Sequence, residues 1–159
     1  MNVKVFLNLL LMVCLASVQG KAQPGFNRSA FYSVLATGTA SDIETQLNVV
    51  NGSAITEKEA YTGTLLMKKA ELVAKAKDKL KFFKSGRSKL EASILKDIEN
   101  TEYRFLRLII QEHAPKVVKY RGEVAEDSQL IRSNFKSLSP SLQEVIIDYS
   151  KKSKVLKNL

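Results

Sequence analysis

Apolar residues recur at spacings of three and four along most of this 159-residue chain, and that spacing limits its possible folds more than any other feature. Residues so spaced share one face of an α-helix, whereas a half-buried strand needs strict alternation. Strand-like alternation is scarce, and the seven glycines are scattered along the chain. The pattern predicts an all-α fold, either a helical bundle or an array of antiparallel helical hairpins, with about five to seven helices.

Capping and helix-breaking residues give the expected helix boundaries. Capping boxes begin at Ser41, Thr56 and Ser88, Ser85-Gly86 reads as a break, and Pro115 ends the helix before it. The short apolar patch at residues 117–120 is compatible with either helix or strand. We expect helices over residues 28–37, 41–50, 56–84, 88–114 and 127–138, and a last helix that Ser139-Pro140 opens.

The first residues of the chain have the pattern of an export signal. One positive charge, Lys4, precedes the apolar run at residues 5–18, and small residues follow where a signal peptidase requires them. The run is too short for a stable membrane anchor. We therefore expect residues 1–22 to be a cleaved signal peptide and residues 23–159 to form a single all-helical domain. This domain would be exported, and thus periplasmic or secreted.

Few residues with catalytic or metal-binding chemistry remain after that cleavage. Cys14, the only cysteine, lies inside the predicted signal, and His113 is the only histidine. A zinc site built on several imidazoles and thiolate catalysis are thereby excluded. His113 is expected to lie, partly exposed, near a helix end. No catalytic residue, metal site or cofactor is predicted, and a non-catalytic role is favoured over an enzyme.

Two sets of neighbouring carboxylates have the spacing of candidate acid–base pairs. Glu99 and Glu102 share a helix face, as do Glu123 and Glu126 or Asp127. Acid–base catalysis would need a cleft that separates the pKa values of the two groups. Because both sets lie in polar sequence near predicted helix ends, we expect solvated surface positions. Asp127 is also expected to cap the helix over residues 127–138.

A basic run is the one feature that suggests a binding mechanism. The net charge is +9, and nine lysines and arginines lie between Lys68 and Lys89 against only Glu71 and Asp78. On a helix these cations could bind phosphates or acidic sugars with release of counterions. The alternative is a solvated face that binds nothing. The candidate anion-binding residues are Lys75, Lys77, Lys79, Lys81, Lys84, Arg87 and Lys89.

The stretch from Phe82 to Leu108 resembles part of a tetratricopeptide-type helical repeat, and Ala92 to Tyr103 within it matches the junction between two repeats. Its alanine-containing helix, acidic turn and following aromatic residue are similar to the place where one repeat ends and the next begins. Ile98 stands where that family has its turn proline. The chain also resembles an uncharacterised family of small exported bacterial helical proteins, through the segment at residues 102–108. These resemblances imply a helical fold and no particular activity.

Together these features predict an exported, non-catalytic helical module that binds another protein in a groove between hairpins. The alternative is an anion-binding protein that uses the basic helix face on envelope polysaccharide, lipid head groups or nucleic acid. Among such partners an acidic polysaccharide or a membrane surface is favoured over nucleic acid. No cofactor is expected in either case.

Overall fold

The computed structural model describes residues 25–157 and 159, so the predicted signal peptide lies outside the described residues. The described part contains seven α-helices, two 3₁₀ turns and no strand, which confirms the all-α prediction. The elements are α2 (Arg28–Thr37), α3 (Ala40–Gly52), α4 (Lys58–Leu72), α5 (Ala76–Lys96), α6 (Thr101–His113), η1 (Lys116–Val118), α7 (Val124–Asn134), η2 (Phe135–Ser137) and α8 (Pro140–Ser150).

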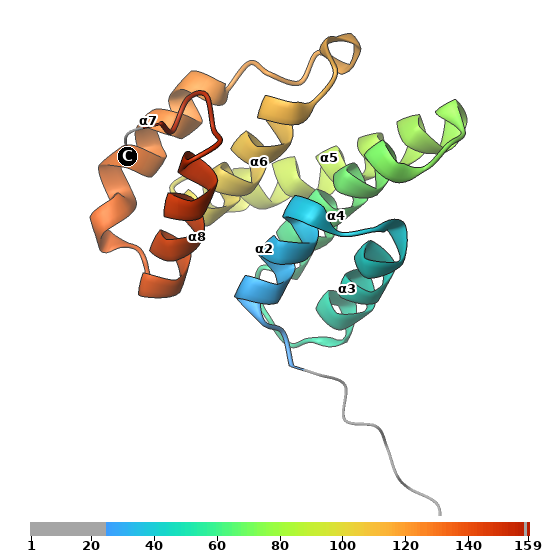
Figure 1. Cartoon of the computed structure of the whole chain (residues 1–159), viewed down its shortest axis with the longest axis horizontal. Coiled ribbons are helices and arrows are strands. Elements are labelled where there is room, and N and C mark those ends of the chain that lie inside the picture. Colours follow the sequence, from blue (N-terminus) through green and yellow to red (C-terminus); the bar gives the residue numbers. More distant parts are fainter. Residues whose placement is uncertain (1–24, 158) are drawn as a thin grey trace, which may run out of the picture.

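The helices are arranged around a central antiparallel hairpin of α4 and α5 (Figure 1). Helix α4 also packs against α3 and α6, while α2 contacts α3 and α8. Helix α7 packs on α6 and completes the C-terminal part of the array. Both ends of the described chain therefore contribute helices to the same packed structure.

The α4–α5 hairpin depends on a close approach between two glycines. A Cβ at Gly63 would lie 2.6 Å from the carbonyl oxygen of Gly86, and a Cβ at Gly86 would lie still closer to that of Gly63. Gly86 is thus a packing residue inside α5, and the predicted break at Ser85-Gly86 is wrong. Ser88 likewise lies within α5 and caps nothing. The chain instead reverses at residues 73–75, where no glycine or proline marks the turn.

Three other predicted boundaries also shift. Helix α3 is capped by Thr39, whose hydroxyl accepts from the Asp42 amide while the Asp42 carboxylate accepts from the Thr39 amide. At α4 no side chain forms the capping box expected from Thr56. The helix predicted over residues 88–114 is interrupted before Asn100, whose side chain accepts from the Tyr103 amide and caps α6. The segment that resembles a tetratricopeptide repeat spans this interruption.

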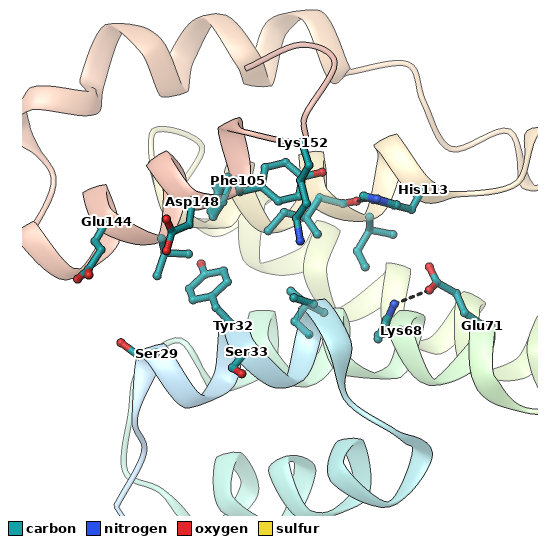
Figure 2. A pocket seen from close by; sticks show the side chains of 16 residues that line it. Ser29, Tyr32, Ser33, Lys68, Glu71, Phe105, His113, Glu144, Asp148 and Lys152 are labelled. Atoms are coloured by element: carbon teal, nitrogen blue, oxygen red, sulfur yellow. Dashed lines mark hydrogen bonds and ion pairs between the residues drawn. The ribbon is translucent and has the colours of Figure 1, made fainter. Parts of the chain in front are cut away.

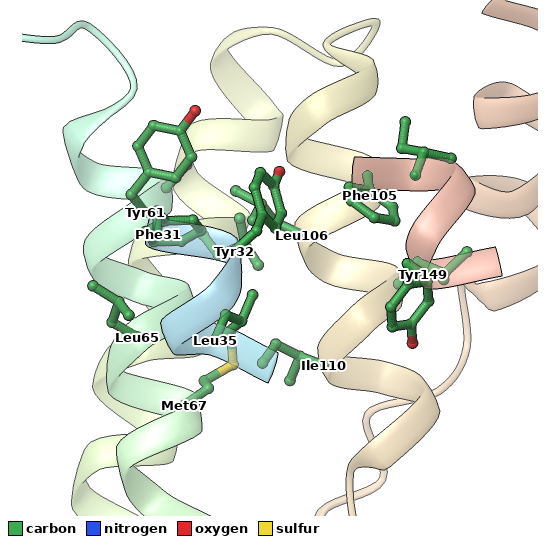
Figure 3. Packing of buried hydrophobic residues seen from close by; sticks show 14 of the residues in the cluster. Phe31, Tyr32, Leu35, Tyr61, Leu65, Met67, Phe105, Leu106, Ile110 and Tyr149 are labelled. Carbon is green, nitrogen blue, oxygen red and sulfur yellow. The ribbon is translucent and has the colours of Figure 1, made fainter. Parts of the chain in front are cut away.

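Helix α2 lies between α4 and α6, and its apolar face forms the centre of the core (Figure 3). Phe31 is fully buried, with its ring centroid 4.6 Å from that of Tyr61 on α4. Tyr32 meets Phe105 of α6 at 5.6 Å, and Phe105 meets Tyr149 of α8 at 5.5 Å. This row of aromatic rings joins α2, α4, α6 and α8, which are not consecutive in the sequence.

Glu102 is buried at the junction of three helices, contrary to the prediction of a solvated position. Its carboxylate accepts from the Arg28 guanidinium at 2.9 and 3.1 Å, from the Tyr61 hydroxyl at 2.6 Å and from the Tyr32 hydroxyl at 3.1 Å. A buried carboxylate is tolerated when its oxygens are hydrogen-bonded and its charge is paired. Glu102 thus ties α2 and α4 to α6.

Asp127 is fully buried inside α7, so the predictions of a helix cap and of a solvated carboxylate are both wrong. Arg107 donates to both of its oxygens at 2.7 Å, and Arg104 donates to one at 3.1 Å. Arg107 also reaches Glu91 of α5 at 3.1 Å. Burial raises the pKa of Asp127, and the two guanidinium groups oppose that shift. This network joins α5, α6 and α7.

Glu112 of α6 holds the segment that follows α8. Its carboxylate accepts from the Tyr149 hydroxyl at 2.9 Å, from the Ser153 hydroxyl at 2.6 Å and from the Lys154 amide at 2.8 Å. Tyr149 and Ser153 are buried by this contact. The C-terminal residues thereby become part of the packed array.

We expect the protein to lose stability as the pH rises above about 10, the usual pKa of a tyrosine. Burial raises the pKa of each of the five tyrosines, and nearby carboxylates add to the shift. Above that pH the folded state therefore holds more protons than the unfolded state, so its free energy of unfolding falls. Absorbance at 295 nm should report the phenolates of the buried Tyr32, Tyr61, Tyr120 and Tyr149 only together with the loss of helical circular dichroism. Ionisation of more than one tyrosine per chain at pH 10 in a fully helical protein would contradict this.

Candidate functional site

An apolar groove with a basic border is the strongest candidate for a binding site, and we call it the basic groove. It has a volume of about 610 Å³ and lies between α4, α5 and the residues that follow α6. Its lining includes Met67 and Phe83, together with Leu80 and Val117, which have 51% and 85% of their surface exposed. Its border carries Lys79, Lys84 and Arg87 of α5, and its lining also includes Ala70, Glu71, Ala76, His113, Ala114, Pro115 and Val118.

The structure divides the predicted anion-binding run into groups with different surroundings. Lys79, Lys84 and Arg87 border the basic groove, where Arg87 also lies 4.7 Å over the Tyr120 ring. Lys77 and Lys81 are exposed on α5 and do not line the groove, and we call them the outer stripe. The remaining two candidates lie apart, Lys75 at the start of α5 and Lys89 in an ion pair with Glu59 at 2.6 Å. The run is therefore not one continuous anion-binding face.

The cations at the groove are not neutralised by neighbouring carboxylates. No ion pair between described residues involves Lys79, Lys84 or Arg87. Glu71, the one carboxylate that lines the groove, pairs with Lys68 at 2.8 Å. Apolar surface and unneutralised positive charge thus lie side by side along α5.

A second hollow, the α2–α8 cleft, has a volume of about 450 Å³ and is lined by residues of α2, α4, α6 and α8 (Figure 2). Many of its polar groups are already engaged. The Tyr32 hydroxyl donates to Glu102, the Tyr149 hydroxyl donates to Glu112, and Asp148 pairs with Lys151. Lys152 lies 5.9 Å from the Tyr149 ring. The cleft also presents unpaired groups of both charges, Glu144 and Lys152, which form no ion pair among the described residues, whereas the unpaired charged side chains that α5 contributes to the basic groove are all cations.

His113 lies where the two hollows adjoin, because it lines both. It is exposed in the last turn of α6, as the sequence predicted, and its Nδ1 lies 2.9 Å from the Ile109 carbonyl oxygen. If Nδ1 donates to that oxygen, Nε2 is the nitrogen available to a ligand. Among the described residues, no hydrogen bond or ion pair joins the ring to a carboxylate.

Among residues 25–157 and 159, no cluster of three or more histidine, cysteine, aspartate or glutamate side chains could hold a metal ion. No helix in the same part of the chain is long and apolar enough to cross a membrane. Comparisons of the chain with protein-family models, with curated proteins and with solved structures give no match. The arrangement of side chains at the basic groove is therefore the observation from which a function can be argued.

The apolar half of the groove was not predicted as a site. The sequence marks residues 117–120 only as a short apolar patch, and it assigns no binding role to Leu80 or Phe83. The sequence feature that could have indicated the groove is that Leu80 and Phe83 lie within the basic run. It points to a groove only once α5 is known to start at Ala76 and to run antiparallel to α4.

Proposed function

We propose that this protein is a non-catalytic helical module that binds another protein in the basic groove. The observation that carries the proposal is the combination of exposed apolar side chains with cations that no carboxylate neutralises. Exposed apolar surface bordered by polar residues is typical of a protein-binding site. Export, predicted from residues 1–22, belongs to the same proposal and would bring the groove to partners outside the cytoplasm.

The charges of the groove favour an acidic partner over a neutral one. Opposite charges around an apolar contact speed association and select the partner. The alternative, a purely electrostatic anion-binding role, would not need the apolar walls. It would place the contact equally well on the outer stripe, where Lys77 and Lys81 are exposed.

We expect the double variant Leu80→Asp and Val117→Asp to lose the partner, because both changes put a carboxylate on an exposed wall of the groove. The protein would serve as bait in an extract of the cells that produce it, and retained proteins would be identified by mass spectrometry. The matched control is Leu95→Asp, since Leu95 is also on α5, is 78% exposed and lies outside the groove.

The informative result is a partner that the wild-type protein and the Leu95 variant retain and the double variant loses. Circular dichroism must first show that all three proteins are equally folded. Equal retention by all three proteins would count against the groove, and so would equal loss from both variants.

A further inference from the structure

We propose that the occupant of the basic groove is an amphipathic α-helix of about three turns, with acidic residues along one edge of its apolar face. This inference rests on the proposed function and specifies the partner segment by its chemistry. It follows from the length of the groove, from the kind of surface that lines it and from the position of its charges.

The length of the groove matches a short helix. Its α5 wall extends from Ala76 to Arg87, and a helix rises about 1.5 Å per residue, so the wall is roughly 16 Å long. A partner helix of about 11 residues has the same length and makes about three turns. Leu80 and Phe83 lie near the middle of this wall, where they can contact its apolar face.

The lining of the groove suits a helix better than an extended strand. Side chains of α4, α5 and η1 form the walls, and the described residues include no strand whose edge could pair with an extended peptide. A helix with a diameter of about 10 Å and three turns occupies roughly 1,300 Å³, about twice the groove volume of about 610 Å³. The partner would therefore lie on the groove and insert only one row of apolar side chains, spaced three and four residues apart.

The lysines and the arginine that line the groove lie on its α5 side, and Glu71, on the α4 side, is paired with Lys68. Lys79, Lys84 and Arg87 all belong to α5, whereas Pro115, Val117 and Val118 on the opposite side carry no charge. Between the first and last of these cations the helix rises roughly 12 Å, or just over two turns. Carboxylates spaced four residues apart along one edge of the partner could reach them, and the opposite edge needs none. The partner is thus expected to be acidic on the edge that faces α5.

The test uses three fluorescein-labelled synthetic peptides of about 14 residues built from leucine, alanine and charged residues. The first is an amphipathic helix with glutamates along one edge. The second is the same peptide with two central alanines replaced by proline, which prevents the helix. The third carries lysines in place of the glutamates. Fluorescence anisotropy measures their binding to the full chain and to its variants.

We expect the first peptide alone to bind, and the double variant Lys79→Glu and Lys84→Glu to weaken its binding at least about tenfold, since it places like charges at the contact. The matched control is Lys77→Glu with Lys81→Glu, which makes the same change of net charge on the outer stripe of the same helix. Because those residues do not line the groove, we expect that control to change the affinity less than about threefold at physiological salt.

Five outcomes would overturn the inference. Equal binding of the proline peptide would exclude a helical occupant, and equal binding of the lysine peptide would exclude an acidic one. Equal loss in both charge-reversal variants would assign the affinity to the overall positive field. Binding of phosphatidylglycerol vesicles in place of any peptide would point to a membrane surface. A fifth outcome separates the two proposals. If no peptide binds, but the wild-type protein retains a cellular partner that the Leu80 and Val117 double variant does not retain, the helix inference fails and the proposed function stands.

Discussion

Gly86→Ala is expected to destabilise the protein by about 1–3 kcal/mol, the cost of overpacking a tight interior. Alanine in place of glycine usually stabilises a helix by about 1 kcal/mol, so the expected change has the opposite sign. The reason is that the new methyl group would meet the Gly63 carbonyl oxygen and would lie 2.9 Å from the Met67 amide nitrogen, both backbone atoms of α4. Backbone atoms cannot turn aside as a side chain does. Urea unfolding followed by circular dichroism at 222 nm measures the difference.

The control for this variant is Gly122→Ala, because a Cβ at Gly122 would meet nothing within 4 Å, and Lys119 is the one residue in the described part of the chain with a positive φ angle. That change should leave the stability unaltered or raise it slightly by restricting the unfolded chain. Equal stability of the Gly86 variant and wild type would show that α4 and α5 can separate at no cost.

Asp127→Asn is expected to cost about 3–5 kcal/mol, since it removes the anion that two guanidinium groups share inside the protein. Arg107 would keep Glu91 as a partner but would lose the carboxylate that it holds through two hydrogen bonds. A buried cation with an incomplete set of partners is strongly unfavourable. The midpoint of urea unfolding should fall accordingly.

Two further variants separate this effect from a general loss of charge. Glu126→Gln removes the neighbouring carboxylate, which also contacts Arg104 at 3.1 Å but is 67% exposed, so it should cost less than about 1 kcal/mol. Replacing Asp127 by leucine together with Arg107 by methionine removes both buried charges and should recover much of the stability. A double variant no more stable than Asp127→Asn would show that the ion pair itself, and not the unpaired cation, determines the cost.

The sequence was sufficient for the fold class because helical periodicity is a local property. Its spacing of apolar residues and the cap at Ser139-Pro140 both correspond to helices in the structure. The boundaries failed where tertiary contacts decide them. Residues 73–75 contain an alanine and a lysine, which favour helix, yet the chain reverses there so that the faces around Gly63 and Gly86 can pack. The turn before α6 did carry a signal in Asn100, a favourable capping residue.

The candidate site was predicted only in part, for a related reason. A lysine or arginine in a sequence is expected to be exposed. The sequence does not show which neighbouring elements lie beside that side chain in the fold. Lys77 and Lys79 are two positions apart and therefore point in directions about 200° apart on α5. The buried carboxylates Glu102 and Asp127 were assigned to the surface because their arginine partners lie on other helices or other turns. An arginine that is distant in the sequence produces no local sequence pattern around the carboxylate with which it pairs.

The contact between Gly63 and Gly86 has a consequence for how this chain could diverge. A side chain at either position pushes α4 and α5 apart, so the two positions cannot vary independently of one another. No comparable steric limit on side-chain size applies to the surface lysines of α5 or to most turns. In a distant relative, a pair of very small residues at matching places in two consecutive helices would therefore outlast the charge pattern as a mark of common descent.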